Sequence, residues 1–458
     1  MLIDRLPCLG LRFVGLSALL LAASVRGDTT PATWKVGPPI FTYNNFSIPS
    51  GIRSSLAIKY GWPEEYDPTT LTPSIAEQAV SAGFNLVWIN DLSQLSIAER
   101  YGLRAQYIIS GHQPQNNLFF PPTADWPSPS DAPAINALID RFKNSPAAYS
   151  YFVIDEPAAN RFDHLAQIVS YLGRRDPAHL AYINLFPPDE ITADLGTANY
   201  AAYVADFIRI VHPAILSYDS YNLFIGNDRS LFLGNLQTIA RAAAQAGIPF
   251  MTIVQGAQFG PKWRLPSADE LRFLTNAPLA FGAQGISYFN FWSPLGPSAG
   301  GIAPHPDGTP TAVYAALSSL APRFKAVAGR LAELHLQWIG TYLKGYLGFA
   351  MPRYMTQPPG NAAFDVANVS NTAPYFDGSP LKGVLLGYFG SGCAAPACAT
   401  HVFVQNIDYT SGKAYRITGP GPLSVFDPAT GAWIPTGHDY ADVRLEAGGG
   451  ALIGLAGH

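Results

Sequence analysis

An apolar run that ends in two adjacent acids is the strongest chemical signal in the sequence. Residues 151–157 read YFVIDEP, so Asp155 and Glu156 close the run. Apolar surroundings raise the pKa of a carboxylic acid, and a protonated acid can donate its proton to a leaving oxygen. We assign that role to Glu156, with Asp155 orienting it or holding a substrate hydroxyl. The alternative is that the two acids cap the helix that follows.

Asp219 is the best candidate for a second carboxylate. It lies in the segment LSYDSYN, residues 216–222, where an apolar run meets polar and aromatic side chains. With two carboxyl groups, one can donate a proton while the other stabilises positive charge or activates the attacking group. The alternative for Asp219 is an acid that only forms hydrogen bonds within its loop.

The elements that must position these acids follow an alternating pattern. From about Ser54 to Pro294, short apolar runs that are typical of buried parallel strands alternate with helical segments. We predict eight such strands: Leu56–Lys59, Leu86–Ile89, Ala105–Ile109, Tyr149–Ile154, Ala181–Asn184, Ala214–Tyr218, Phe250–Val254 and Ile286–Phe291.

Helix signals lie between the predicted strands. Thr72 and Pro73 suit the start of a helix over residues 74–82, and Ser267 with Glu270 forms a capping-box pattern. Two further helices are predicted over residues 231–246 and 312–334. Eight strand–helix units predict an α/β fold in the form of a closed (β/α)8 TIM barrel. An open doubly wound sheet is disfavoured because no glycine-rich phosphate turn follows the first strand.

In such a barrel the βα-loops gather at the carboxyl ends of the strands, so the residues there are the site candidates. They combine carboxylates with amides and aromatic rings, which suits the binding of a sugar. Each of the candidates for substrate binding has a core or loop role as its alternative. They are Trp62, Asn90, His112, Asn184, Tyr221, Gln255, Asn290 and Trp292.

Beyond about Lys344 the pattern changes to strand-like runs with no helix between them. This predicts a small antiparallel β-sandwich after the barrel, with domains over residues 28–340 and 341–458. The predicted strands are Gly383–Tyr388, His401–Ile407, Ala414–Thr418, Val443–Leu445 and Ala451–Leu455. Cys393 and Cys398 have a spacing that allows a small disulfide at a hairpin tip. A metal site there is disfavoured, since only His401 lies near.

The first 27 residues resemble a secretory signal peptide. Arg5 and Arg12 precede an apolar stretch from Phe13 to Ala23, and small residues then lead to a cleavage site after Gly27. The alternative is an uncleaved membrane anchor. No later stretch is long enough to span a membrane, so we expect an exported protein, secreted or periplasmic, with no membrane contact after cleavage.

Composition narrows the range of partners. The formal charge is −4 and the charged fraction is 13%, which gives no electrostatic reason to expect nucleic acid. The sequence contains no HExxH pattern and no P-loop. We therefore expect neither a metal nor a cofactor, and the sequence does not indicate an oligomeric state.

Three motifs carry a resemblance to a known group of enzymes. The Asp-Glu-Pro at 155–157 resembles the Asn-Glu-Pro that closes the fourth strand in the large clan of retaining (β/α)8 glycoside hydrolases. The segment from Glu270 to Trp292 looks like the last helix–strand unit of β-galactosidase-like members. Residues 425–433 (VFDPATGAW) and 443–452 (VRLEAGGGAL) look like their terminal β-domain. The resemblance implies that Glu156 is the acid/base.

The sequence departs from that clan at two positions. Asp155 stands where the clan has Asn, and an adjacent Asp-Glu pair also occurs in hexosaminidases that use the acetamido group of their substrate. Gln255 stands at the end of the seventh strand, where the clan has its nucleophilic Glu. Asp269 and Glu270 lie too far along the chain, at a helix start, to replace that group.

The sequence thus supports three hypotheses. The first is hydrolysis of a glycosidic bond in an oligo- or polysaccharide, with Glu156, Asp219 and Asp155 as the catalytic residues. The second is a non-catalytic carbohydrate-binding protein on a hydrolase scaffold, which Gln255 favours. The third is substrate-assisted cleavage of an N-acetylhexosaminide by Asp155 and Glu156.

Overall fold

The computed structural model describes residues 39–43, 70–109, 118–119, 126–188, 192–226, 228, 231–258, 262–291, 301–302, 309–334, 337–345, 354–369 and 382–457. Three groups of predictions lie outside these ranges. They are the signal peptide, the first predicted strand at Leu56–Lys59, and the site candidates Trp62, His112 and Trp292.

Eight parallel strands form two four-stranded sheets, in the orders β1-β8-β7-β6 and β2-β3-β4-β5. The strand beside β8 is Ile40–Tyr43, so the described chain provides a parallel strand ahead of the segment predicted as the first one. The other seven predictions are confirmed to within two residues at each end. The strands are β1 (Ile40–Tyr43), β2 (Leu86–Ile89), β3 (Arg104–Ile108), β4 (Ala148–Asp155), β5 (Leu180–Asn184), β6 (Leu216–Ser220), β7 (Phe250–Gln255) and β8 (Gly285–Phe289).

The two parallel sheets adjoin each other along both edges. On one side, the Leu185 amide donates to the Ser217 carbonyl at 2.9 Å, which links the end of β5 to β6. On the other side, the Thr42 hydroxyl of β1 donates to the Leu86 carbonyl of β2 at 2.7 Å. A small internal cavity between the sheets is lined by residues of β1 to β5, β7 and β8. Residues of both sheets therefore line this cavity.

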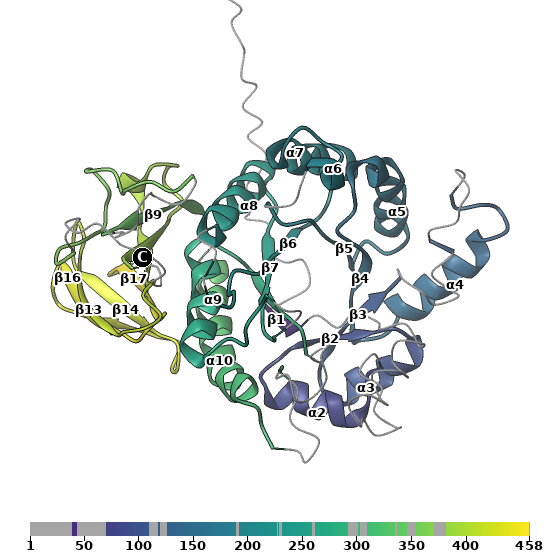
Figure 1. Cartoon of the computed structure of the whole chain (residues 1–458), viewed down its shortest axis with the longest axis horizontal. Helices are drawn as coiled ribbons and strands as arrows, with labels where there is room; N and C mark the ends of the chain where they lie inside the picture. Colours follow the sequence, from purple (N-terminus) through teal and green to yellow (C-terminus); the bar gives the residue numbers. More distant parts are fainter. Residues whose placement is uncertain are drawn as a thin grey trace, which may run out of the picture.

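Helices lie outside the parallel strands, as Figure 1 shows. Several begin where the sequence predicts: the Thr72 hydroxyl caps α2, and Ser267 with Glu270 forms the predicted capping box of α9. Within the described ranges, no helix combines the length and apolarity that crossing a membrane requires. The helices are α2 (Pro73–Ser81), α3 (Leu95–Arg100), α4 (Ala132–Lys143), α5 (Phe162–Arg175), α6 (Thr192–Leu195), α7 (Tyr200–Val211), α8 (Phe232–Ala246), α9 (Ala268–Ala280) and α10 (Ala312–Glu333), with short 3-10 turns at Leu92–Gln94, Ala159–Arg161 and Pro396–Cys398.

The C-terminal part consists of two antiparallel sheets, in the orders β15-β14-β17-β12-β11-β9 and β10-β13-β16. Buried side chains of both sheets belong to one hydrophobic cluster. The five predicted strands are confirmed, and β9, β10, β14 and β15 are additional. The strands are β9 (Trp338–Lys344), β10 (Asp365–Val366), β11 (Val384–Phe389), β12 (His401–Asn406), β13 (Lys413–Thr418), β14 (Leu423–Asp427), β15 (Ala432–Pro435), β16 (Tyr440–Leu445) and β17 (Gly450–Leu455).

The predicted disulfide between Cys393 and Cys398 is present, in the connection between β11 and β12. It closes a short loop on one connection and touches neither parallel sheet. Its role is therefore local.

The C-terminal sheet packs against α9, to the left of the parallel sheets in Figure 1. The Thr341 hydroxyl of β9 donates to the Ala280 carbonyl at 2.6 Å, and the Gln405 amide of β12 donates to the Phe273 carbonyl at 3.0 Å. The closest approach is at Gly387 of β11, where an added Cβ would lie 2.0 Å from the Ala280 carbonyl oxygen. A side chain at position 387 is thus incompatible with this interface.

We predict that Gly387→Ala lowers the free energy of unfolding by about 1–3 kcal/mol, because the methyl group forces β11 and α9 apart. Urea unfolding of the purified variant measures the change. Gly392→Ala is the matched control, since a Cβ at Gly392 meets nothing within 4 Å. Equal stability of the two variants would contradict the close packing of β11 on α9.

Candidate active site

Asp155 and Glu156 lie at the carboxyl end of β4, and both are half-buried. Glu156 has φ of +44°, a left-handed conformation that costs a non-glycine residue about 1–3 kcal/mol. Its backbone amide donates to the Asn184 carbonyl at 2.9 Å, which holds the residue in this conformation. Such strained residues concentrate at functional sites.

Neither acid caps the next helix. The 3-10 turn after β4 begins at Ala159 with Ala158 as its cap, and α5 follows at Phe162 with Arg161 as its cap. Neither cap residue contributes a side-chain hydrogen bond, and both lie beyond Asp155 and Glu156. The capping alternative for the two acids is therefore wrong.

One amide connects the acids of neighbouring strands. The Nδ2 of Asn184, at the end of β5, donates to Asp155 Oδ1 at 3.0 Å and to Asp219 Oδ1 at 2.9 Å. Its Oδ1 accepts from the Ser217 hydroxyl at 3.1 Å, and that hydroxyl lies 2.6 Å from the Tyr182 hydroxyl. Both Asn184 amide protons and the amide oxygen are thus used within the site.

Burial raises the pKa of both connected acids. For Asp155, burial has the largest effect and the neighbouring charge of Glu156 the next, so its pKa rises to about 7 although Asn184 opposes the rise. Asp219 is only 4% exposed, and its pKa lies well above the usual range through burial and the charges of Glu156 and Asp155. A side-chain hydrogen bond also joins Asp219 to Glu156. Asp155 and Asp219 together therefore retain a proton near neutral pH.

Aromatic rings border the acids on the side of β7 and β8. Tyr221, just after β6, lies in ring contact with Phe289 at the end of β8, with centroids 5.3 Å apart. Burial raises the pKa of Tyr221, and the charges of Asp219, Asp155 and Glu156 raise it further. The Tyr221 hydroxyl therefore keeps its proton and can donate a hydrogen bond.

Gln255, at the end of β7, is fully buried and bonded to main chain. Its Oε1 accepts from the Leu223 amide at 3.1 Å, while its Nε2 donates to the carbonyls of Leu223 at 3.1 Å and Arg264 at 2.6 Å. Glu270 lies at the start of α9, as the sequence predicts, where it completes the capping box and pairs with Arg264 at 2.5 Å. In the described chain, the acids near the strand ends that lie in the site come from β4 and β6.

The amide candidates Asn90 and Asn290 are both largely buried. Asn90 Oδ1 accepts from Gln94 Nε2 at 2.6 Å, which ties Asn90 to the turn after β2. Asn290, after β8, has a buried Oδ1 that meets no donor among the described residues. Of the two, Asn290 keeps hydrogen-bonding capacity for a ligand.

The structure thus gathers five of the predicted site residues: Asp155, Glu156, Asn184, Asp219 and Tyr221. Sequence reasoning missed Tyr182, Ser217 and Phe289. Ser217 precedes Asp219 by two residues on β6, and alternate residues of a strand share a face. The two-residue period of a strand is therefore the sequence signal that could have identified Ser217. No group of three or more potential ligands in the described ranges is arranged to hold a metal ion.

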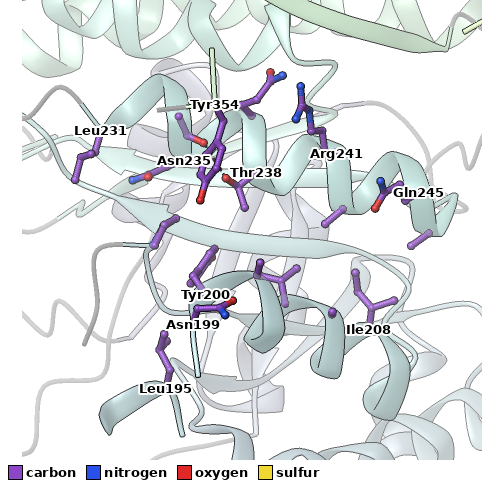
Figure 2. A pocket seen from close by; sticks show the side chains of 18 of the residues that line it. Leu195, Asn199, Tyr200, Ile208, Leu231, Asn235, Thr238, Arg241, Gln245 and Tyr354 are labelled. Carbon is purple, nitrogen blue, oxygen red and sulfur yellow. Dashed lines mark hydrogen bonds between the residues drawn. The ribbon is translucent and has the colours of Figure 1, made fainter. Parts of the chain in front are cut away.

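A large cavity of about 1020 Å³ lies in the helical layer between α7 and α8. Figure 2 shows side chains of both helices facing it, among them Tyr200, Ile208, Thr238 and Arg241, with Tyr354 above them. Its described lining contains arginines but no carboxylate. It therefore lacks the groups for acid catalysis, and the acids at the strand ends remain the candidate active site.

Neither a protein-family model nor a curated protein matches the sequence. Several solved structures are similar to this chain. A structure described as a glycoside hydrolase has 12% identity and a TM-score of 0.48, and the alignment covers 85% of this chain and 91% of that one. The β-L-arabinopyranosidase of Geobacillus stearothermophilus has 10% identity, a TM-score of 0.46 and coverage of 94% and 99%. A putative α-L-fucosidase from Bacteroides thetaiotaomicron has 9% identity, a TM-score of 0.42 and coverage of 63% and 94%.

The raised pKa of Asp155 predicts a pH effect on stability. Between the ordinary pKa of 3.8 and about 7, the folded protein binds more protons at this site than the unfolded chain does, so this group destabilises the fold as pH rises through that window. Asp155→Asn removes the effect. We expect the variant to gain stability relative to the unmodified protein between about pH 4.5 and pH 8, by on the order of 1–3 kcal/mol.

Urea unfolding at the two pH values measures this gain. Asp91→Asn is the control, because hydrogen bonds from Ser93 lower the pKa of the exposed Asp91 below its ordinary value. Asp91 is therefore ionised in both the folded and the unfolded chain at the two pH values, and the relative stability of that variant should stay the same. A gain for Asp91→Asn, or none for Asp155→Asn, would contradict the assignment of the buried charge to Asp155.

Proposed function

We propose that the protein is a glycoside hydrolase that cleaves an O-glycosidic bond in an oligo- or polysaccharide, with Glu156 as general acid/base. The observation that carries this proposal is the joining of Asp155, Asp219 and Glu156 through Asn184 and a shared hydrogen bond. Buried carboxyl groups that retain a proton supply the acid that glycoside hydrolysis needs. The rings of Tyr221 and Phe289 beside them offer apolar surface to a sugar.

We infer further that the two parallel sheets close into a (β/α)8 barrel. The contacts along both edges and the cavity shared by strands of both sheets support closure. On this basis residues 28–340 form the catalytic domain and residues 341–458 a β-sandwich. We also propose that residues 1–27 are a cleaved signal peptide and that the mature protein is exported. We propose that the protein is related to the large clan of retaining (β/α)8 glycoside hydrolases.

The roles that we propose for the acids follow from how exposed their side chains are. Glu156 is half-buried and reaches a ligand, whereas Asp219 is almost fully buried and holds the shared proton next to it. Glu156 donates a proton to the glycosidic oxygen as the carbon–oxygen bond breaks, and positive charge develops on the sugar ring. Asp219 or Asp155 stabilises that charge as a carboxylate or activates the attacking group. Asn290 Oδ1, which meets no donor among the described residues, can accept a hydrogen bond from a sugar hydroxyl.

The second candidate function is carbohydrate binding without turnover. The observation that favours it is Gln255, because no carboxylate stands at the end of β7. Calorimetry with oligosaccharides beside a reducing-sugar assay separates the two functions: binding without product supports the second. Substrate-assisted cleavage of an N-acetylhexosaminide, the third hypothesis, requires strong inhibition by thiazoline mimics of the cyclic intermediate.

We predict that Glu156→Gln lowers kcat by about 10²- to 10⁴-fold, because the amide cannot supply the proton. Reducing-sugar release from a panel of soluble polysaccharides identifies the substrate first and then measures the loss. Circular dichroism and thermal unfolding should show an unchanged fold. Asp91→Asn, an exposed acid near the end of β2, is the control and should keep its activity. Full activity of Glu156→Gln would remove Glu156 from the mechanism.

The contact between Asp219 and Glu156 also predicts the stereochemistry. Carboxyl groups lie about 5–5.5 Å apart in retaining glycosidases and about 6.5–9.5 Å apart in inverting ones. The charge of Glu156 raises the pKa of Asp219, so we propose that the two carboxyl groups have the shorter of these separations. We expect the first product to keep the anomeric configuration of the substrate, as proton NMR of a fresh digest measures. Inversion would show that the two groups separate when substrate binds.

A further inference from the structure

Two loops at the carboxyl ends of the parallel strands pair as short extended segments. Phe224, in the loop after β6, is bridged in antiparallel fashion to Trp263, in the loop after β7. The Ile225 amide donates to the Lys262 carbonyl at 2.8 Å and the Arg264 amide to the Leu223 carbonyl at 3.1 Å. These bonds flank the pair, so Phe224 and Trp263 lie opposite each other on one face. Their ring centroids are 5.4 Å apart. We call Phe224 and Trp263, with the neighbouring Leu265, the aromatic platform.

Hydrogen bonds and ion pairs from neighbouring elements hold the platform in place. Gln255 bonds to the main chain on both sides of the pair, at Leu223 and Arg264. The Arg264 guanidinium donates to both carboxylate oxygens of Asp228 at 2.8 Å and pairs with Glu270 at the start of α9. Asp228 in turn accepts from the Tyr409 hydroxyl of the C-terminal domain at 2.5 Å. The paired segments 223–225 and 262–264 are therefore held by these bonds before any ligand arrives.

The platform nevertheless exposes apolar surface. Leu265 is 37% exposed, while Phe224 and Trp263 are half-buried. Neighbouring residues of an extended segment point to opposite faces. Because Arg264 points to Glu270 and α9, the Trp263 ring lies on the side opposite α9. A rigid apolar surface that stays exposed is a feature of binding sites.

The platform lies close along the chain to the candidate active site. Only the segment Ser220 to Leu223 separates Asp219 from Phe224, a span of at most about 17 Å. Within that segment Tyr221 contacts Phe289 of β8. Since β7 lies between β6 and β8, these two rings meet across the end of β7. The Tyr221–Phe289 pair and the platform thus both lie at the ends of β6 to β8, on the same side of the sheet as the acids of β4 and β6.

We propose that the aromatic platform binds the part of a carbohydrate chain that lies outside the scissile bond, through stacking of a sugar ring on Trp263 and Phe224. This inference rests on the proposed function and specifies its substrate class. The substrate is then an oligo- or polysaccharide that spans at least the acid cluster and the platform, and a single sugar with a small leaving group does not reach the platform. A flat apolar ring face is the surface that the carbon–hydrogen face of a sugar requires.

The test combines Trp263→Ala with Glu156→Gln, so that binding is measured without turnover. The probes are xylan, mannan, glucan and galactan oligosaccharides, titrated by calorimetry against parent and variant. We expect the Kd of the oligosaccharide that binds the parent to rise about tenfold or more on loss of the ring. Trp263→Phe, which keeps a ring, should recover most of the affinity. In the protein that retains Glu156, the kcat/KM for nitrophenyl monosaccharides should not change with Trp263→Ala.

The chain supplies a matched control. Trp433 of β15 lies opposite Phe426 of β14, also in an antiparallel pair, with ring centroids 5.4 Å apart. Trp433→Ala removes the same ring from the C-terminal domain and should leave oligosaccharide binding unchanged. Tyr409→Phe, which keeps the ring but removes the bond to Asp228, should weaken binding less than Trp263→Ala does.

The outcomes separate this inference from the proposed function. An unchanged Kd in Trp263→Ala, or an equal loss for nitrophenyl monosaccharides, overturns the platform while hydrolysis by the unmodified protein still stands. Binding that depends on Trp263, in a protein that releases no product, supports the platform and overturns the hydrolase. If Trp263→Ala does not fold, Trp263→Phe and Trp263→Leu decide: the platform predicts weaker binding with the aliphatic residue, and equal affinity overturns it.

Discussion

The amide of Asn184 holds the site together, because it is the group on which two buried carboxyl groups converge. Burying two acids side by side is unfavourable unless they are hydrogen-bonded or one of them is neutral. The Asn184 amide donates one hydrogen bond to Asp155 and one to Asp219. The Ser217 hydroxyl donates to the amide oxygen and so fixes the orientation of the amide. The bonds lower the pKa of each acid, but burial and mutual repulsion raise it more. The result is a cluster that retains a proton near neutral pH.

The same residue fixes the strained backbone at Glu156. The Asn184 carbonyl accepts the Glu156 amide, so one residue of β5 sets the main chain of β4 and the side chains of β4 and β6. The cost of the left-handed conformation, about 1–3 kcal/mol, is offset by pairing along β4 and β5. A chain under no functional constraint would place glycine at such a position. The presence of Glu there is consistent with selection for its carboxyl group.

Local signals predicted most of the elements but fewer of the contacts. Apolar runs bounded by turn residues located β2 to β8 to within two residues, and Thr72 and Ser267 marked helix starts correctly. The strand Ile40–Tyr43 was missed because its partner β8 lies far along the chain, so no local pattern reveals the pairing. The strands β14 and β15 were missed because they are short and flanked by glycine and proline. Adjacency of Asp155 and Glu156 was visible in the sequence, whereas their convergence on Asp219 depends on the register between β4, β5 and β6.

Gln255 explains why the acids lie on β4 and β6 and none on β7. Its amide faces one main-chain donor and two main-chain carbonyls, so the position requires a group that both accepts and donates. A glutamate there would accept from the Leu223 amide, but its carboxylate would also face the carbonyls of Leu223 and Arg264 in a fully buried position, at a cost of several kcal/mol. The fixed pair of loops after β6 and β7 therefore excludes an acid at the end of β7. In a chain built this way, any second carboxylate for chemistry has to come from a neighbouring strand, and β6 provides it at Asp219.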